Sequence, residues 1–87
     1  MAHITMYGSQ RCSLCSYIEQ LLKQKGVTDF VKILIDTDIA QRAQMIARTG
    51  QRAVPQIFID DTHVGGYADL LTLDRRGRLD DLLSVKC

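Results

Sequence analysis

Two cysteines three positions apart, Cys12 and Cys15, are the residues of this 87-residue chain whose type and spacing could do chemistry. In a Cys-Ser-Leu-Cys motif the two sulfurs can form an internal disulfide, or they can supply half of a zinc site. Zinc needs two further ligands, for which His3, His63 and Cys87 are the candidates, but no second Cys-x-x-Cys or His-x3-His spacing occurs. The pattern therefore favours redox chemistry, and we expect no metal site.

The pair stands where a helix is expected to begin. Apolar residues recur at helical spacing over residues 13–25, at Leu14, Ile18, Leu21 and Leu22, and Gly26 follows as a stop signal. Unpaired N–H groups and the helix dipole favour an anion at this end, so they lower a thiol pKa from about 8.5 to roughly 3.5 to 7.5. We therefore expect Cys12 to be the nucleophilic thiolate and the more shielded Cys15 to be the resolving thiol.

Short apolar segments alternate with helical patterns along the rest of the chain. Asp36, Thr37 and Asp38 offer capping oxygens to a second helix, and Asp60-Asp61 joins two short segments as a hairpin. Strands are expected over residues 3–7, 31–36, 56–59 and 62–65, and helices over 13–25, 39–49 and 67–75, with a last amphipathic turn at Leu79, Leu82 and Leu83. The order β-α-β-α-β-β-α predicts an α/β fold with a mixed sheet, in which residues 1–87 form a single domain.

Composition excludes several classes of function. The chain is 46% hydrophobic and 24% charged with a net charge of +1, which is typical of a globular protein and gives no basic patch for nucleic acid. The longest aliphatic run, residues 33–35, is too short for a membrane span, and no secretory signal is visible. Three cysteines cannot all pair within the chain, so we expect a reducing, cytoplasmic setting and a terminal Cys87 thiol without a catalytic role.

Several motifs in a fixed order carry a resemblance to a known family. With Tyr7, the cysteine pair, Ala53-Val54-Pro55 and Gly65-Gly66, the chain resembles the glutaredoxins over nearly its whole length. The likeness is greatest to the small bacterial glutaredoxin 3 type, in residues 21–27, 54–60 and 63–66.

The resemblance implies a fold and an activity. The fold would be thioredoxin-like, a four-stranded mixed sheet flanked by helices. The activity would be the reduction of protein disulfides and glutathione mixed disulfides, with glutathione as the electron source. The partners would be glutathione and disulfide-containing or glutathionylated proteins, and the chain is expected to act as a monomer.

The resemblance also implies where glutathione binds. Pro55 would be cis and face the cysteine pair, and the backbone of Val54 would pair with the extended tripeptide, although a simple strand-start proline is the alternative. The glutamyl end would meet the start of the last long helix, where Asp69 can take the ammonium group and backbone N–H groups the carboxylate. The positions that the resemblance assigns to glutathione, besides the two cysteines, are Arg11, Leu14, Gln51, Arg52, Ala53, Val54, Pro55, Gly66, Tyr67, Ala68 and Asp69.

One departure from the family pattern concerns the glycine carboxylate of glutathione. Relatives have a lysine a few residues before the first cysteine, and the matching position here is Ser9. Gln51, Arg52 or Arg11 would have to supply that contact. For Arg11, an exposed side chain without a role is the equal alternative.

A second departure lies inside the motif, where the commonest family sequence is Cys-Pro-Tyr-Cys and this chain has Ser13 and Leu14. Ser13 leaves the loop looser than proline would, and Leu14 keeps an apolar surface without a phenol. Some family members with serine at that position bind a glutathione-ligated [2Fe-2S] cluster between two subunits. A cluster-binding dimer held through Cys12 is therefore the alternative function, and visible absorbance of anaerobically purified protein separates the two.

Overall fold

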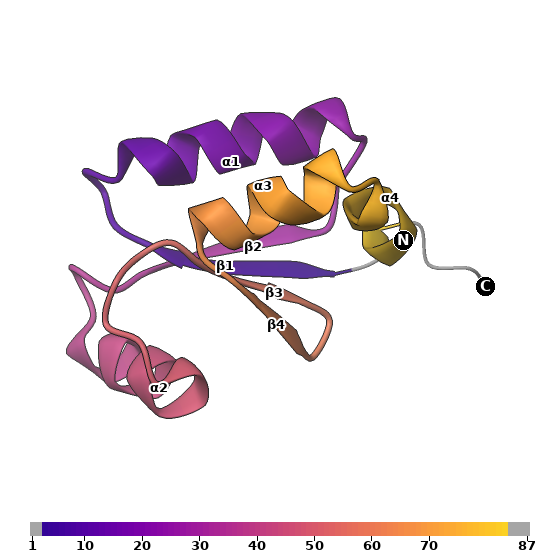
Figure 1. Cartoon of the computed structure of the whole chain (residues 1–87). Helices are drawn as coiled ribbons and strands as arrows, with labels where there is room; N and C mark the ends of the chain where they lie inside the picture. Colours follow the sequence, from indigo (N-terminus) through magenta and orange to yellow (C-terminus); the bar gives the residue numbers. More distant parts are fainter. Residues whose placement is uncertain (1–2, 84–87) are drawn as a thin grey trace.

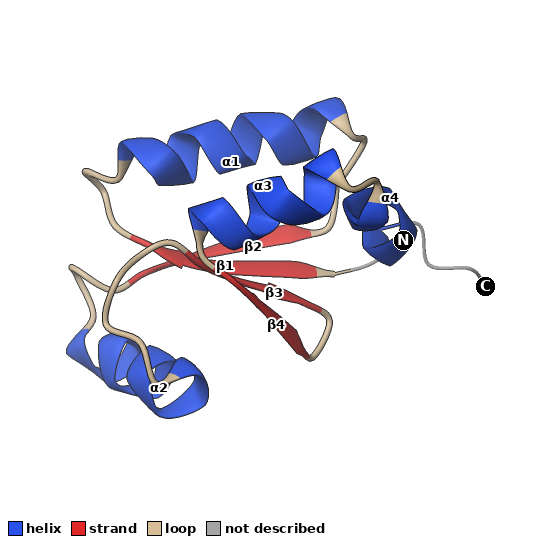
Figure 2. Ribbon diagram, viewed as in Figure 1, coloured by secondary structure: helices blue, strands red, loops and turns tan. Residues whose placement is uncertain are grey.

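Four strands form one mixed sheet with helices on both of its faces in the computed structural model, which describes residues 3–83 (Figure 1). In chain order the elements are β1 (Ile4–Gly8), α1 (Ser13–Gln24), β2 (Phe30–Leu34), α2 (Ile39–Thr49), β3 (Gln56–Ile59), β4 (Thr62–Gly65), α3 (Tyr67–Arg75) and α4 (Arg78–Leu83). Helices α1 and α3 cover one face of the sheet and α2 covers the other (Figure 2). The predicted order of elements and the thioredoxin-like arrangement are confirmed.

The sheet order β2-β1-β3-β4 decides which loops meet. Strand β1 is parallel to β2 and antiparallel to β3, so the end of β1 lies beside the start of β3, with Tyr7 opposite Gln56. The loop that leads from β1 to Cys12 and the segment that ends at Pro55 therefore leave the sheet at the same end.

Alternate side chains of β1 supply the two halves of the core, as expected for a strand with both faces covered. Ile4 and Met6 pack on the side of α1 and α3, whereas Tyr7 packs on the side of α2. The first cluster includes Cys15, Ile18, Leu22, Ile57, Leu70 and Leu79, and the second includes Ile35, Met45 and Phe58. Cys15 is thus part of the core under α1.

Lys25, the residue after α1, fastens the end of that helix to α3 and α4. Its Nζ lies 2.7 Å from Asp80 Oδ1 and 2.9 Å from Asp74 Oδ1. The hydrogen bond to Asp80, followed by the one to Asp74, raises the pKa of Lys25 above its ordinary value. The helix that carries the cysteine pair is therefore held at the end away from the pair.

Four strand boundaries differ from those predicted: β1 begins and ends one residue later, and β2 begins one residue earlier and ends two residues earlier. Strand β1 begins at Ile4 because His3 is bonded to the hairpin turn, its N–H donating to Asp60 Oδ1 at 3.0 Å. Strand β2 ends at Leu34, two residues before its predicted end, because Asp36 leaves the sheet. The Asp36 side chain accepts the N–H of Gln10, in the loop after β1.

The caps of the first two helices can also be compared with the prediction. Of the three candidate caps for α2, only Asp38 serves, accepting the N–H groups of Ala40 and Gln41. Helix α1 ends at Gln24 with Lys25 as its C-cap.

The prediction for Cys87 lies outside the described residues. Among helices in the described residues, none has the length and apolar character needed to cross a membrane.

Candidate functional site

Cys12 is the N-cap of α1, as the sequence predicts. Its backbone is extended (φ −88°, ψ 103°), and its Sγ accepts a hydrogen bond from the Cys15 N–H at 3.1 Å. Sulfur thus takes the place that a serine or aspartate oxygen fills at most helix starts. An N–H group aimed at this sulfur stabilises negative charge on it when the pair is reduced.

Cys12 and Cys15 are joined as a disulfide, with their Cα atoms 5.2 Å apart. Cys12 is half-buried, whereas Cys15 is fully buried in the core under α1. The predicted difference in shielding is therefore confirmed. An incoming disulfide reaches the sulfur of Cys12 first, and Cys15 is placed behind it.

Gly8, at the end of β1, makes room for the buried sulfur, and the sequence analysis did not identify it. A Cβ at this position would lie 2.8 Å from Cys15 Sγ, closer than such atoms approach. The signal that could have found it is a glycine that ends a buried strand just before a cysteine motif.

Gly8→Ala should lower the free energy of unfolding by about 1 to 3 kcal/mol, because an added methyl group overpacks a site that is already filled. Urea unfolding of the oxidised protein measures the change. Ser9→Ala, at the neighbouring position, should shift it by less than about 0.5 kcal/mol. An unchanged midpoint for Gly8→Ala would mean that the Cys15 side chain moves aside freely.

The segment before β3 lies at the same end of the sheet. The Val54–Pro55 peptide bond is cis, as the resemblance implied. Pro55 is buried, Val54 is half-buried and Ala53 is exposed. Gln56 follows directly, and its side-chain Nε2–H donates to the Ala53 carbonyl oxygen at 3.0 Å. An exposed segment on a buried base thus lies at the end of the sheet from which the loop to Cys12 also leaves.

The start of α3 closes the site from a third direction. Gly66 is the N-cap, and a Cβ there would lie 3.3 Å from the Pro55 carbonyl oxygen, so the two segments are in close contact. The Asp69 Oδ2 atom accepts the Gly66 N–H at 2.9 Å. Tyr67 and Ala68 are the first residues of the helix, whose first-turn N–H groups lack helical partners.

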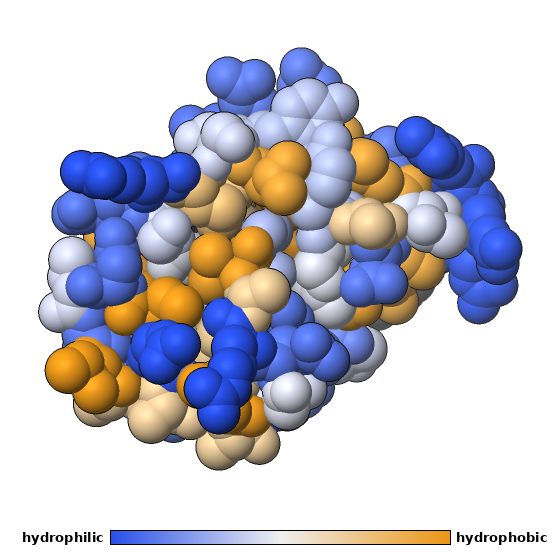
Figure 3. Space-filling model, turned by 60° about the vertical axis from the view of Figure 1, so that its left-hand side comes forward, coloured by the Kyte–Doolittle hydropathy of each residue, from blue (hydrophilic) through white to orange (hydrophobic). Residues whose placement is uncertain are grey.

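Two aromatic rings join the beginnings of α1 and α3. Tyr17 and Tyr67 meet edge to face with ring centroids 5.6 Å apart. Leu14 and Tyr17, three residues apart and so neighbours on α1, remain 42% and 53% exposed. Figure 3, which brings this end of the molecule forward, shows separate apolar patches among hydrophilic side chains. Apolar surface therefore adjoins the first turn that follows Cys12.

Three candidate contacts for a carboxylate lie in loops. Arg11 precedes Cys12, and Gln51 and Arg52 lie between α2 and β3; all three are exposed. Within residues 3–83 their side chains make no hydrogen bond or ion pair. They are available to an anion at this end of the sheet, and none is held in a fixed position.

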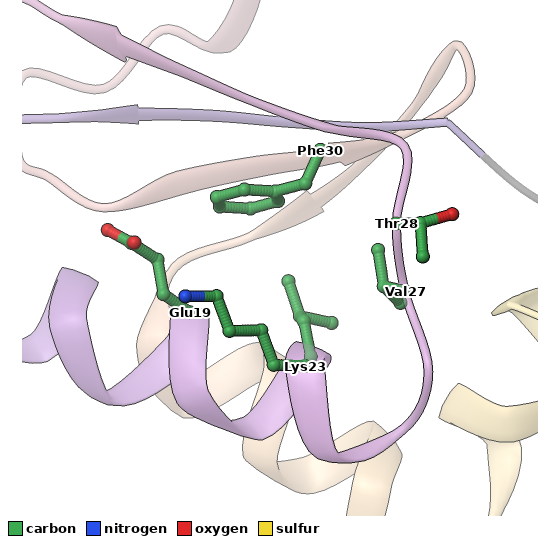
Figure 4. Close-up of a pocket in the computed structure, with 6 residues that line it drawn as sticks. Glu19, Lys23, Val27, Thr28 and Phe30 are labelled. Atoms are coloured by element: carbon green, nitrogen blue, oxygen red, sulfur yellow. The ribbon is translucent and has the colours of Figure 1, made fainter.

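A cavity of about 220 Å³ lies elsewhere, at the far end of α1 (Figure 4). Phe30 extends into it from β2, facing Glu19 and Lys23 of α1. Within the described residues no group of three or more His, Cys, Asp or Glu side chains is placed to hold a metal ion. The redox pair, at the other end of the helix with only Cys12 partly exposed, is the site that carries chemistry.

Comparison with protein families matches residues 4–64 to the glutaredoxin family model. Glutaredoxin 3 of Escherichia coli (strain K12) is 47% identical over 83 residues, which cover 95% of this chain and 99% of that protein. A glutaredoxin of Pseudomonas aeruginosa is 44% identical over 85 residues, 98% of this chain and 100% of that protein.

Solved structures show the same likeness. A buckwheat glutaredoxin–glutathione complex superposes with a TM-score of 0.86 at 29% identity, covering 95% of this chain and 77% of that one. The solution structure of a glutaredoxin from Brucella melitensis gives a TM-score of 0.81 at 38% identity, covering 95% and 89%. The matched family region includes both the cysteine pair and the cis-proline segment.

Proposed function

This chain belongs to the glutaredoxin family, and from that premise we propose that Cys12 is the attacking thiolate of a glutathione-dependent thiol–disulfide oxidoreductase and Cys15 its resolving thiol. The observation that carries the assignment is the N-cap position of Cys12, whose sulfur accepts the Cys15 N–H while Cys15 itself is buried. The thiolate is the reactive form of cysteine, and a helix N-terminus stabilises it.

The reaction proceeds by exchange at sulfur. The Cys12 thiolate attacks the glutathionyl sulfur of a protein–glutathione mixed disulfide, a bond forms between these two sulfurs, and the protein thiolate leaves and takes up a proton. A second glutathione thiolate then attacks the glutathionyl sulfur, which yields glutathione disulfide and restores Cys12. In the dithiol route the Cys12 thiolate attacks one sulfur of a protein disulfide, and the Cys15 thiolate then attacks the Cys12 sulfur and releases the reduced protein partner. The resulting Cys12–Cys15 disulfide is reduced by two glutathione molecules.

The proposed glutathione site runs from the cis-proline segment to the start of α3. Val54 offers its backbone to the tripeptide, and the first N–H groups of α3, at Tyr67 and Ala68, face the glutamyl carboxylate. Supporting this placement, Gly66 lies against the Pro55 carbonyl, and the structurally similar buckwheat glutaredoxin is in complex with glutathione. Arg11, Gln51 or Arg52 would take the glycine carboxylate.

Asp69→Asn tests the glutamyl end of this site. One carboxylate oxygen of Asp69 holds the Gly66 N–H, and asparagine can still accept that bond while losing the charge that pairs with the glutathione ammonium group. We expect KM for a glutathione mixed disulfide to rise about two- to fivefold with kcat unchanged, because exposed ion pairs contribute at most about 1 kcal/mol. Asp61→Asn, in the hairpin turn, is the matched control and should change neither constant. Equal KM values for Asp69→Asn and wild type would remove Asp69 from the site.

Protein partners of the enzyme would be disulfide-containing or glutathionylated proteins. The exposed side chains of Leu14 and Tyr17 give such a partner apolar surface beside the reacting sulfur. Glutathione as electron source requires a compartment with a reducing glutathione pool, so we propose a cytoplasmic location. The proposed reaction uses one Cys12 and one Cys15, which a monomer supplies.

The direct test of the proposed function is steady-state reduction of a small mixed disulfide of glutathione and 2-mercaptoethanol, coupled to glutathione reductase. Wild-type protein should turn the substrate over with reduced glutathione as the second substrate. A protein that shows no turnover above the uncatalysed rate at saturating glutathione would overturn the proposal.

A further inference from the structure

Gln56 is the one buried polar residue in the described core, and it directly follows the cis-proline. The residue is 5% exposed, yet both ends of its side-chain amide have hydrogen-bond partners. The Nε2–H donates to the Ala53 carbonyl at 3.0 Å, and the Oε1 atom lies 2.9 Å from His63 Nε2. Since the Oε1 atom can only accept, the His63 ring carries its proton on Nε2.

The hydrogen bond to Ala53 is what ties the exposed segment to the sheet. In the described part of the chain no other hydrogen bond holds residues 52–55. The Val54 side chain packs on the cluster around Phe58, which fixes one point of the segment. The bond from Gln56 then sets the direction of the backbone on either side of Val54.

His63 is itself held in place. Its ring packs on Phe58 with centroids 5.0 Å apart, and the Arg48 guanidinium carbon lies 4.0 Å from the Phe58 ring centroid. Arg48 also donates to the Tyr7 hydroxyl at 2.9 Å. His63 is exposed as a whole residue, but its ring packs on Phe58, so the hydrogen bond to Gln56 comes from a ring that lies against the sheet.

We propose that Gln56 is a positioning residue for glutathione, its side chain linking His63 of the hairpin to the Ala53 carbonyl and so orienting the Val54 backbone that the tripeptide pairs with. The inference rests on the proposed function, because it concerns the same glutathione site. Gln56 lies beneath the segment and touches neither reacting sulfur. It should therefore affect the binding of glutathione substrates and leave the reactivity of Cys12 as it is.

Two substitutions separate the parts of the link. Gln56→Glu keeps the size and the acceptor for His63 but replaces the N–H that binds Ala53 with an oxygen. His63→Phe keeps a ring on Phe58 and removes the donor to Gln56. Gln44→Glu makes the same chemical change on the exposed surface of α2 and is the matched control.

For Gln56→Glu we expect KM for the glutathione mixed disulfide to rise about five- to tenfold, with kcat within about twofold of wild type. His63→Phe should give a smaller rise in KM, and Gln44→Glu none. The rate at which iodoacetamide alkylates Cys12 in the folded, reduced proteins should be the same in all four. A merely structural role would lower the melting temperature and the active fraction without changing KM of the folded enzyme.

The outcomes distinguish this inference from the function on which it rests. Failure of wild-type protein to turn over the mixed disulfide would overturn the proposed function itself. An active wild type with an unchanged KM in both Gln56→Glu and His63→Phe would overturn the positioning role alone. A changed rate of Cys12 alkylation in Gln56→Glu would also overturn it, since the effect would then lie at the sulfur and not at the glutathione site.

Discussion

Cys12→Ser should abolish turnover of glutathione mixed disulfides, with a loss of at least about a thousandfold. Serine fits the N-cap position, where its hydroxyl can accept the Cys15 N–H as the sulfur does, so the fold should persist. A hydroxyl is not ionised at neutral pH and cannot form the mixed disulfide with glutathione. Steady-state reduction of the small mixed disulfide measures the loss.

The pH dependence of Cys12 alkylation tests the reason for that loss. If the N–H groups at the start of α1 hold the sulfur as a thiolate, the rate of alkylation by iodoacetamide should stay nearly constant across neutral pH. An ordinary thiol has a pKa of about 8.5, and below that pH its rate of alkylation would rise tenfold with each unit increase in pH. Such a rising profile for Cys12, or residual turnover in Cys12→Ser, would contradict the assignment of the nucleophile.

The order of the elements was predictable because local signals agree with the tertiary structure. The apolar repeat over residues 13–25 faces the core through Ile18 and Leu22, and the glycines after the first two helices adopt positive φ, 85° at Gly26 and 71° at Gly50. The position of Cys12 at a helix start follows from the same signals. The central chemical feature of the site was therefore present in the local sequence.

The remainder of the site depends on contacts between residues far apart in the chain. From the local sequence Gly8 is only the end of a strand. The packing of α1 on the sheet shows that the Cys15 sulfur occupies the space that a side chain at position 8 would fill. Gln56 looks like an ordinary strand residue, because its bond to His63 arises from the pairing of β3 with β4. Strand ends were missed for a similar reason, since Asp36 bonds to a loop 26 positions away.

Cys15→Ser should separate the two routes of the reaction. The N–H that stabilises the Cys12 sulfur belongs to the backbone of residue 15, so serine keeps it and the thiolate remains reactive. We expect turnover of glutathione mixed disulfides to stay within about threefold of wild type, since a second glutathione completes that route. Reduction of an intramolecular protein disulfide should fall to the background rate, because the Cys12 mixed disulfide then has no internal thiol to release the partner.

The matched control is Cys87→Ser, which removes the chain's third cysteine and should leave both activities unchanged. Mass spectrometry of the Cys15→Ser protein after exposure to a disulfide-containing protein should show the trapped adduct on Cys12. Full reduction of protein disulfides by Cys15→Ser would show that glutathione alone resolves the adduct. In that case the buried sulfur behind Cys12 would serve packing under α1 and not the reaction.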